Sequence, residues 1–217
     1  MLYLYPEAPE EAIIKTQEKL KSSGVRLLNL YVSKFGKDEA DYRKWFEFGK
    51  KMGIRTFVSE PDAKTLDALD PLCKEYKIRL AIHNHPKHGE TYTNWNPDNV
   101  IKLIDGRSRF IGCCADTGHW VRSGLDPVEC LKKYEGHVFC LHLKDVNEKG
   151  PKGEDVPYGT GVSNVKGQLE ELARQKFAGV ISIEYESKKA DNREDVKKCV
   201  EFFNKTASEI GTKLAAR

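Results

Sequence analysis

The feature that most constrains the fold of this chain is a regular alternation of short apolar runs with amphipathic segments. The apolar runs are rich in β-branched residues and predict strands. They cover residues 25–32, 54–59, 78–84, 110–115, 138–146 and 179–186. The segments between them carry apolar residues at helical spacing, and Gly24 and Gly53 are typical helix ends. This alternation predicts a parallel sheet covered by helices.

Two architectures fit such a sheet: an open doubly wound sheet or a closed barrel. A doubly wound nucleotide-binding fold carries a glycine-rich turn after an early strand, and no such turn is found there. The sequence therefore favours an α/β fold of the TIM-barrel type with about six recognisable βα units. A length of 217 residues suits one α/β core, so we expect a single domain over residues 1–217.

Composition excludes several classes of function. The formal net charge is only +3, and no basic stripe stands out, so we expect no nucleic-acid partner. No run approaches the roughly 20 apolar residues that span a bilayer, and no secretory signal is visible, so we expect no membrane partner. The six cysteines lack zinc-type or redox spacing. They predict buried reduced thiols in a cytoplasmic protein.

Ionisable side chains gather where the predicted strands end. These residues are Glu60, His83, His85, Asp116, His142, Lys144, Glu184 and Glu186. The carboxyl ends of the strands of a parallel barrel form one rim, where function lies. Imidazole and carboxylate donors together suit Mn²⁺, Fe²⁺, Co²⁺ or Zn²⁺ and are too rich in nitrogen for a calcium site. We therefore expect one divalent metal ion, with His83, Asp116, His142 and Glu184 as its ligands.

Each of these residues also has an ordinary structural interpretation. A single histidine in a strand can be a hydrogen-bonded core residue, and Glu60 could cap the helix that begins near Pro61. Glu186 could be a solvated acid with Lys144 as its counter-charge. The coincidence across five consecutive strands favours a functional site, because burying that many ionisable groups is unfavourable unless a metal or substrate pairs them.

Five segments carry a resemblance to a known family. They read AIHNHP, CADTGHW, LHLKDVN, VPYGTG and GVISIEYES, in that order. From about Gly24 to the C-terminus, the chain resembles the sugar phosphate isomerase/epimerase family of xylose isomerase-like TIM barrels. The resemblance implies one divalent metal, often Mn²⁺, although Zn²⁺, Co²⁺, Fe²⁺ or Mg²⁺ would also fit. Asp116, His142 and Glu184 match the family's ligand positions, and His83 stands where many members have a glutamate.

The resemblance also implies an activity and its residues. We expect an isomerase or epimerase that acts on a sugar, keto-sugar or polyol, with or without a phosphate group, through an enediolate. Glu184 is the expected proton-transfer residue, assisted by Lys144 and His119. The expected substrate contacts are His85, His119, Glu60, Lys144 and Trp120.

Two departures from the family keep other interpretations open. A metal-bound imidazole at His83 cannot replace one of two proton-transferring glutamates, so a dehydratase or lyase is the alternative reaction. Six strands instead of the eight of a complete barrel imply that the first two βα units are missing. This predicts an unusual barrel or a homo-oligomer, or else a non-catalytic truncated barrel.

A DNA-repair endonuclease of related fold would need a three-metal cluster and a basic groove, which the sequence does not supply. The glycine loop at residues 158–161 is either a phosphate-binding or substrate-closing loop, or an ordinary turn.

Overall fold

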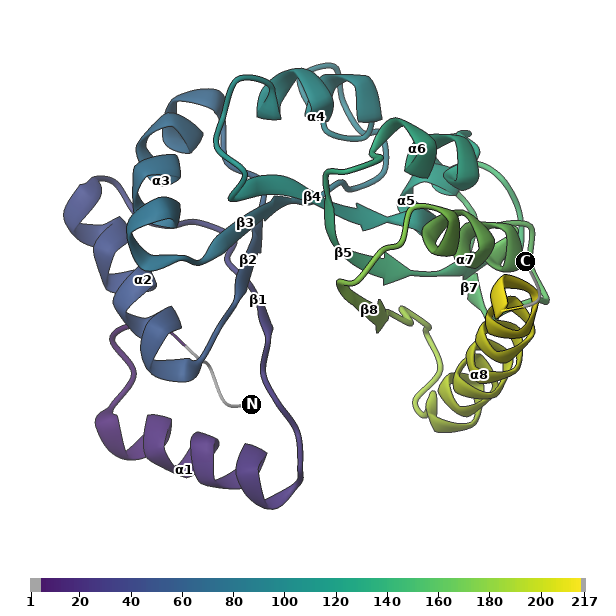
Figure 1. The fold of residues 1–217 in the computed structure, drawn as a ribbon, viewed down its shortest axis with the longest axis horizontal. Coiled ribbons are helices and arrows are strands. Elements are labelled where there is room, and N and C mark those ends of the chain that lie inside the picture. Colours follow the sequence, from purple (N-terminus) through teal and green to yellow (C-terminus); the bar gives the residue numbers. More distant parts are fainter. Residues whose placement is uncertain (1–4, 216–217) are drawn as a thin grey trace. The chain divides into compact units, whose positions relative to one another are not determined.

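A computed structural model of the chain describes residues 5–215, with side chains as far as residue 211. The strands and helices alternate along the chain and are labelled in Figure 1. They form two compact units. The first contains Met1–Ile82 and Gly106–Gly112, and the second contains His83–Asp105 and Cys113–Arg217.

The first unit is built on three parallel strands in the order β1-β2-β3. Its elements are α1 (Glu10–Ser22), β1 (Asn29–Tyr31), α2 (Glu39–Met52), β2 (Thr56–Ser59), α3 (Ala63–Tyr76) and β3 (Arg79–Ile82). Asp38 caps the N-terminus of α2 and Asp62 that of α3, each by accepting a backbone N–H. Phe46 of α2 packs edge-on against Phe57 of β2, with ring centroids 5.3 Å apart, and this contact ties the helix to the sheet.

The second unit continues the alternation with parallel strands in the order β4-β5-β8. Its elements are α4 (Pro97–Ile104), β4 (Ile111–Asp116, which begins in the first unit), α5 (Thr117–Arg122), α6 (Pro127–Lys133), β5 (Val138–Leu143), β6 (Asp145–Val146), β7 (Asp155–Val156), α7 (Val165–Arg174), β8 (Val180–Ile183) and α8 (Arg193–Ala215). The short strands β6 and β7 form a separate antiparallel pair. Asp116 pairs with His142 across β4 and β5, so both lie at the same level of the sheet.

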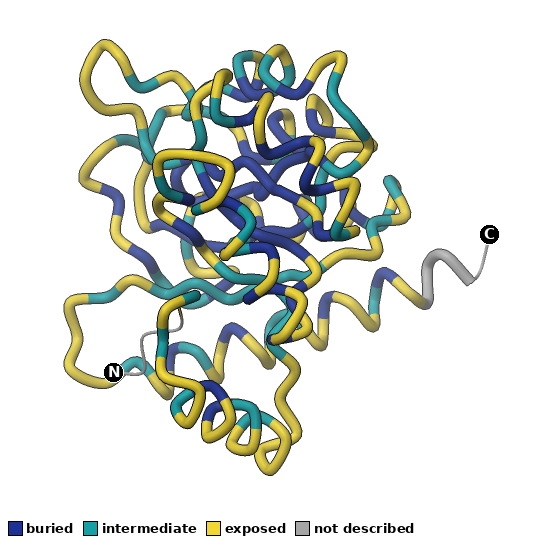
Figure 2. Tube along the Cα trace, turned by 90° about the vertical axis from the view of Figure 1, so that its left-hand side faces the viewer, coloured by how far each residue is buried: buried dark blue, intermediate teal, exposed yellow. Residues whose placement is uncertain are grey.

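Strands β2 and β4 are buried along their whole length, as expected of parallel strands covered on both faces. The buried segments of the chain appear dark blue in Figure 2. All six cysteines are buried and reduced, as the sequence predicts. Among the described residues, no helix is both long and apolar enough to span a membrane.

The predicted α/β fold with six parallel strands is confirmed. Several boundaries were wrong. The strands expected at residues 78–84 and 179–186 end at Ile82 and Ile183. The strand expected at residues 25–32 is limited to Asn29–Tyr31, and Val25 is exposed. The strand expected at residues 138–146 breaks after Leu143, so Lys144 lies between β5 and β6. The single-domain assignment stays a prediction.

Candidate metal site

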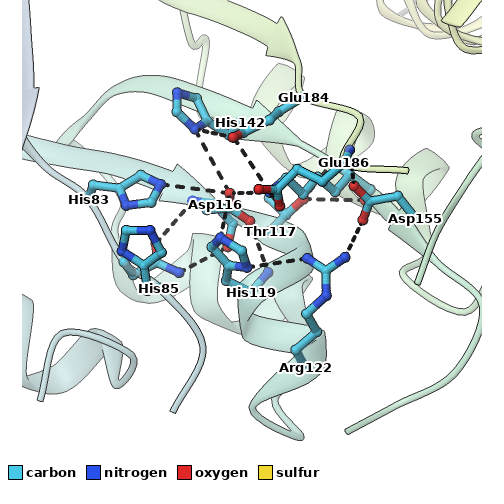
Figure 3. A network of polar contacts seen from close by, with 12 residues as sticks. His83, His85, Asp116, Thr117, His119, Arg122, His142, Asp155, Glu184 and Glu186 are labelled. Atoms are coloured by element: carbon cyan, nitrogen blue, oxygen red, sulfur yellow. Dashed lines mark hydrogen bonds and ion pairs between the residues drawn. The ribbon is translucent and has the colours of Figure 1, made fainter. Parts of the chain in front are cut away.

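Four side chains from the ends of four successive strands converge in the second unit. His83 comes directly after β3 in the chain, Asp116 ends β4, His142 lies in β5 and Glu184 directly follows β8. Each offers one ligand atom, and these four atoms lie within 4.8 Å of one another. Asp116 Oδ2 is 3.7 Å from His83 Nε2 and 3.8 Å from His142 Nδ1. His142 Nδ1 is 2.5 Å from Glu184 Oε2, and Figure 3 shows the side chains pointing toward one another.

The donor set fits a divalent metal ion. Asp116 Oδ2, His142 Nδ1 and Glu184 Oε2 are buried, and none of them has a hydrogen-bond partner of suitable geometry among the described residues. These atoms contact one another and Lys144 only as ion pairs, and since buried polar atoms in native proteins are nearly always hydrogen-bonded, the group fits a bound ion. Two imidazoles and two carboxylates within this radius match the usual coordination of zinc or manganese. The ligand roles themselves stay a prediction.

Asp116 is held in place by contacts that leave one of its oxygens for the cluster. Its Oδ1 accepts the backbone N–H of His119 at 2.9 Å and so caps the N-terminus of α5. The buried side-chain amide of Asn84 donates to the Asp116 carbonyl and accepts the Asp116 N–H, both at 3.0 Å. Sequence analysis missed Asn84, although a buried amide between two predicted site histidines was a usable signal.

Lys144 supplies the positive charge of the cluster. Its side chain is fully buried, with Nζ 3.0 Å from Asp116 Oδ2, 3.5 Å from Glu184 Oε2 and 2.7 Å from Glu186 Oε2. The Lys144 backbone N–H donates to Thr117 Oγ1 at 3.1 Å. A Cβ atom on Gly118 would lie 2.7 Å from Lys144 Cβ, so this glycine makes room for the lysine. The Thr-Gly pair of the DTGHW segment therefore positions Lys144.

The charges of the cluster shift one another's pKa values. Burial alone would raise the pKa of Asp116, but the charge of Lys144 and the contacts of nearby imidazoles lower it well below its usual range. Burial also opposes ionisation of Glu184, and again the neighbouring imidazole and ammonium lower the pKa. Burial would lower the pKa of Lys144, yet the surrounding carboxylates raise it. The ion cluster is therefore charged at neutral pH.

Two further predicted histidines lie beside the candidate ligands. The His85 ring is 4.7 Å from that of His83 and 5.3 Å from that of His119, measured between centroids. Burial lowers the pKa of His119 to about 3, with the charge of Asp116 acting in the opposite direction. His119 is therefore neutral across the ordinary pH range.

The remaining predicted contacts are placed differently. Glu60 lies in the first unit, directly after β2, and is half-buried. Trp120 is fully buried, and its ring packs edge-on against Tyr134 with centroids 5.2 Å apart. The indole thus has no exposed surface for a ligand, and the substrate roles of Trp120 and Glu60 stay predictions.

The glycine loop at residues 158–161 points backbone N–H groups toward the buried side chain of Asp145. The buried carboxylate of Asp145 accepts the backbone N–H groups of Gly159 at 2.8 Å, Gly161 at 3.0 Å, Ser163 at 3.0 Å and Val146 at 3.0 Å. A Cβ atom on Gly161 would lie 2.4 Å from an Asp145 oxygen, so a glycine is needed for the close approach. Since Asp145 already binds these N–H groups, the geometry favours the ordinary-turn interpretation over a phosphate-binding loop.

The chain is similar to several known proteins. A curated inosose dehydratase of Clostridium perfringens is 29% identical over 143 residues, which are 66% of this chain and 46% of the relative. The chain thus spans about half the length of that relative. An uncharacterized protein from Parabacteroides distasonis, whose crystal structure is known, is 35% identical in sequence. The match covers 94% of this chain and 79% of that protein's chain, with a TM-score of 0.71. A D-tagatose 3-epimerase-like protein shares the fold at 18% identity, with coverage of 95% and 86% and a TM-score of 0.77.

A family model described as xylose isomerase-like TIM barrel matches residues 5–206, which is most of the chain. This match confirms the resemblance that the sequence segments predicted. The chain belongs to the xylose isomerase-like TIM barrel family.

Proposed function

We propose that this chain is a divalent-metal-dependent enzyme that isomerises or epimerises a sugar, keto-sugar or polyol by moving a proton on a carbon next to a carbonyl. The observation that carries the proposal is the convergence of four metal-competent atoms from four strand ends. Members of this fold act at that end of the strands. The D-tagatose 3-epimerase-like neighbour supports a sugar as substrate.

The exposure of the carboxylates suggests which of them binds the metal and which transfers a proton. Asp116 is fully buried, whereas the side chain of Glu184 is 34% exposed and that of Glu186 is 56% exposed. A substrate can reach Glu184, so we assign proton transfer to it. Asp116 serves only as a ligand. Lys144 is enclosed by the three carboxylates, and we assign it the task of keeping them ionised and in place.

When bound, a divalent ion supplies Lewis-acid stabilisation of the negative charge that develops on the substrate oxygens. His83, Asp116, His142 and Glu184 would hold it. Imidazole and carboxylate donors suit Mn²⁺ and Zn²⁺ equally well in type, and Mn²⁺ is the ion that we propose first. His85 and His119 line the same cluster and are the proposed substrate contacts.

A dehydratase acting on a similar substrate is the second candidate. The curated relative from Clostridium perfringens is an inosose dehydratase. Moreover, His83 supplies an imidazole where the resemblance leads us to expect a second carboxylate. One carboxylate base is enough for proton abstraction followed by loss of water, whereas epimerisation by two metal-bound glutamates would need a carboxylate at position 83.

The experiment has a binding step and a reaction step. Elemental analysis of the purified protein is expected to give about one equivalent of metal, lost in Asp116→Ala. It should be kept in Asp98→Ala, where the changed carboxylate is surface-exposed and paired with Lys133. A metal-free, folded wild-type protein in metal-supplemented buffer would contradict the proposal.

In heavy water, incubation with a panel of sugars, keto-sugars and inososes should lead to deuterium incorporation next to a carbonyl. Incorporation with an isomeric product supports the isomerase or epimerase, and release of water supports the dehydratase. Bound metal without any exchange would identify the non-catalytic alternative. The predicted homo-oligomer is checked separately by light scattering, where a stable monomer contradicts it.

A further inference from the structure

Arg122, the last residue of α5, connects the candidate site to the β6–β7 hairpin. Its side chain is only 10% exposed, and its Nε donates to the Gly153 carbonyl at 3.0 Å. Its Nη2 donates to Asp155 Oδ1, and its Nη1 lies 3.2 Å from His119 Nδ1. Figure 3 shows this chain of contacts running from the hairpin to the histidine.

Asp155 is itself fixed from two sides. Its carboxylate is 1% exposed, and Oδ2 accepts the backbone N–H of Glu186 at 2.7 Å while Oδ1 pairs with Arg122. Gly153 and Asp155 of the hairpin therefore fix the orientation of the guanidinium plane, and the backbone of Glu186 fixes Asp155 in turn. Because the guanidinium is planar and its Nε and Nη2 are both held, the direction of the Nη1 N–H groups is fixed as well.

The chemistry of the two side chains at that contact allows one arrangement. A guanidinium has N–H donors, no acceptor and no accessible neutral form. The partner atom, His119 Nδ1, must accept through its lone pair and so carries no proton. A neutral imidazole with a bare Nδ1 has its proton on Nε2. That nitrogen lies 3.4 Å from Asp116 Oδ2, on the side of the metal cluster.

We propose that Arg122, oriented by Asp155, is a positioning residue that locks His119 in the tautomer protonated at Nε2. His119 then presents a neutral N–H donor at the edge of the metal site. It can donate a hydrogen bond to a substrate oxygen, but it can neither take up a substrate proton nor bind the metal through that nitrogen. The substrate-side role of this donor rests on the proposed function, whereas the tautomer does not.

This assignment also bears on the candidate metal site. His119 Nε2 lies 3.4 Å from Asp116 Oδ2, although His119 is not one of the four residues whose ligand atoms all lie within 4.8 Å of one another. An Nε2 that carries a proton has no lone pair for a metal. With Nε2 protonated, His119 would not become a third imidazole ligand beside His83 and His142, and it would act as a hydrogen-bond donor instead.

Nitrogen NMR of histidine-labelled, metal-free protein tests the tautomer directly, without any substrate. Wild-type His119 is expected to show a protonated Nε2 and a bare Nδ1, and Arg122→Met is expected to give a mixture of tautomers. Arg193→Met is the matched control, since Arg193 pairs with Asp191 at an exposed site and should leave the His119 pattern unchanged. A proton on Nδ1 in the wild type, or an unchanged pattern in Arg122→Met, would overturn the proposal.

Titration with Mn²⁺ alone separates this inference from the proposed function. Arg122→Met should bind Mn²⁺ within about threefold of the wild type, less than the roughly 10-fold or larger loss typical when the support of a ligating residue is removed. A larger loss would make Arg122 a supporter of the metal ligands and overturn the inference. Failure of both proteins to bind Mn²⁺ would count against the proposed function and leave the NMR result standing.

With a substrate from the exchange experiment, His119→Gln and His119→Asn provide a further comparison. A glutamine amide can place an N–H near the Nε2 position, whereas the shorter asparagine reaches only as far as Nδ1. We expect His119→Gln to retain at least about 10-fold more kcat/KM than His119→Asn, in keeping with the loss of one hydrogen bond to a polar substrate group. Equal or reversed activities would contradict an Nε2 donor.

Discussion

Lys144→Met provides the sharpest test of how the site is balanced electrostatically. The substitution keeps most of the volume of the stem and removes the ammonium. Lys144 Nζ is 3.0 Å from Asp116 Oδ2, and neither side chain has any exposed surface. Asp116 would therefore remain buried beside two further carboxylates, Glu184 and Glu186, with its main counter-charge gone.

The distance sets the size of the effect. Two unit charges 3.0 Å apart attract with about 5.5 kcal/mol at an effective dielectric constant of about 20. The cost of burying the ammonium offsets part of this attraction in the wild type. Breaking a buried ion pair by removing one partner typically costs about 3–5 kcal/mol, and we expect the metal-free Lys144→Met protein to lose that much stability.

The measurement is urea unfolding in the presence of a chelator, with Lys188→Met as the matched control. Lys188 pairs with Glu154 at 2.7 Å, but its side chain is 92% exposed, so its loss should leave the stability nearly unchanged. Excess Mn²⁺ should then stabilise Lys144→Met more than the wild type, because the ion restores positive charge among the same carboxylates. Equal stability of the two lysine variants, or equal stabilisation of Lys144→Met and wild type by Mn²⁺, would refute this reasoning.

Three other substitutions test separate parts of the structure. Asp145→Asn replaces an acceptor of four backbone N–H groups by a group that is half donor, and should cost about 2–3 kcal/mol in thermal or urea unfolding. Asn84→Ala leaves the buried backbone N–H and carbonyl of Asp116 without their present partner and should cost about 2 kcal/mol, while a loss below about 0.5 kcal/mol would show that water replaces the amide. Hydrogen bonds from Arg174 lower the pKa of Glu171, so Glu171 contributes stability above its ordinary pKa that is lost as the pH falls. Glu171→Gln should therefore be less stable than the wild type at pH 7, and the difference should shrink as the pH falls below the ordinary pKa of a glutamate and through the lowered pKa of Glu171. A difference independent of pH would exclude this linkage.

Much of the fold could be predicted because its signals are local. The six strands are short apolar runs, and Gly53 ends α2 in the left-handed conformation that favours glycine. Helix α5 was missed because it has six residues, includes Gly118 and shows no apolar stripe. It forms because Asp116 caps its first turn, and a capping interaction over so few residues leaves no periodic pattern in the sequence.

The candidate ligands could be predicted from strand ends, because parallel strands bring their carboxyl ends to one edge. The residues that hold the ligands could not. Arg122 meets Asp155 across 33 positions of sequence, and Asp155 lies in a two-residue strand without any alternation to mark it. Such contacts depend on how the hairpin folds back onto α5, which only the three-dimensional structure shows.

The charge balance of the cluster explains why a histidine at position 83 suits this chain. Asp116, Glu184 and Glu186 surround one ammonium, that of Lys144, so the metal-free cluster already carries a net charge of about −2 if all four groups are ionised. A glutamate at position 83 would add a further negative charge next to the fully buried Asp116, and like charges this close destabilise one another. An imidazole offers a ligand atom 3.7 Å from Asp116 Oδ2 without adding a negative charge. Under the proposed function, the same exchange would remove a proton-transfer group from one side of the substrate. The residue that reduces repulsion in the metal-free site would then also limit the reactions open to it.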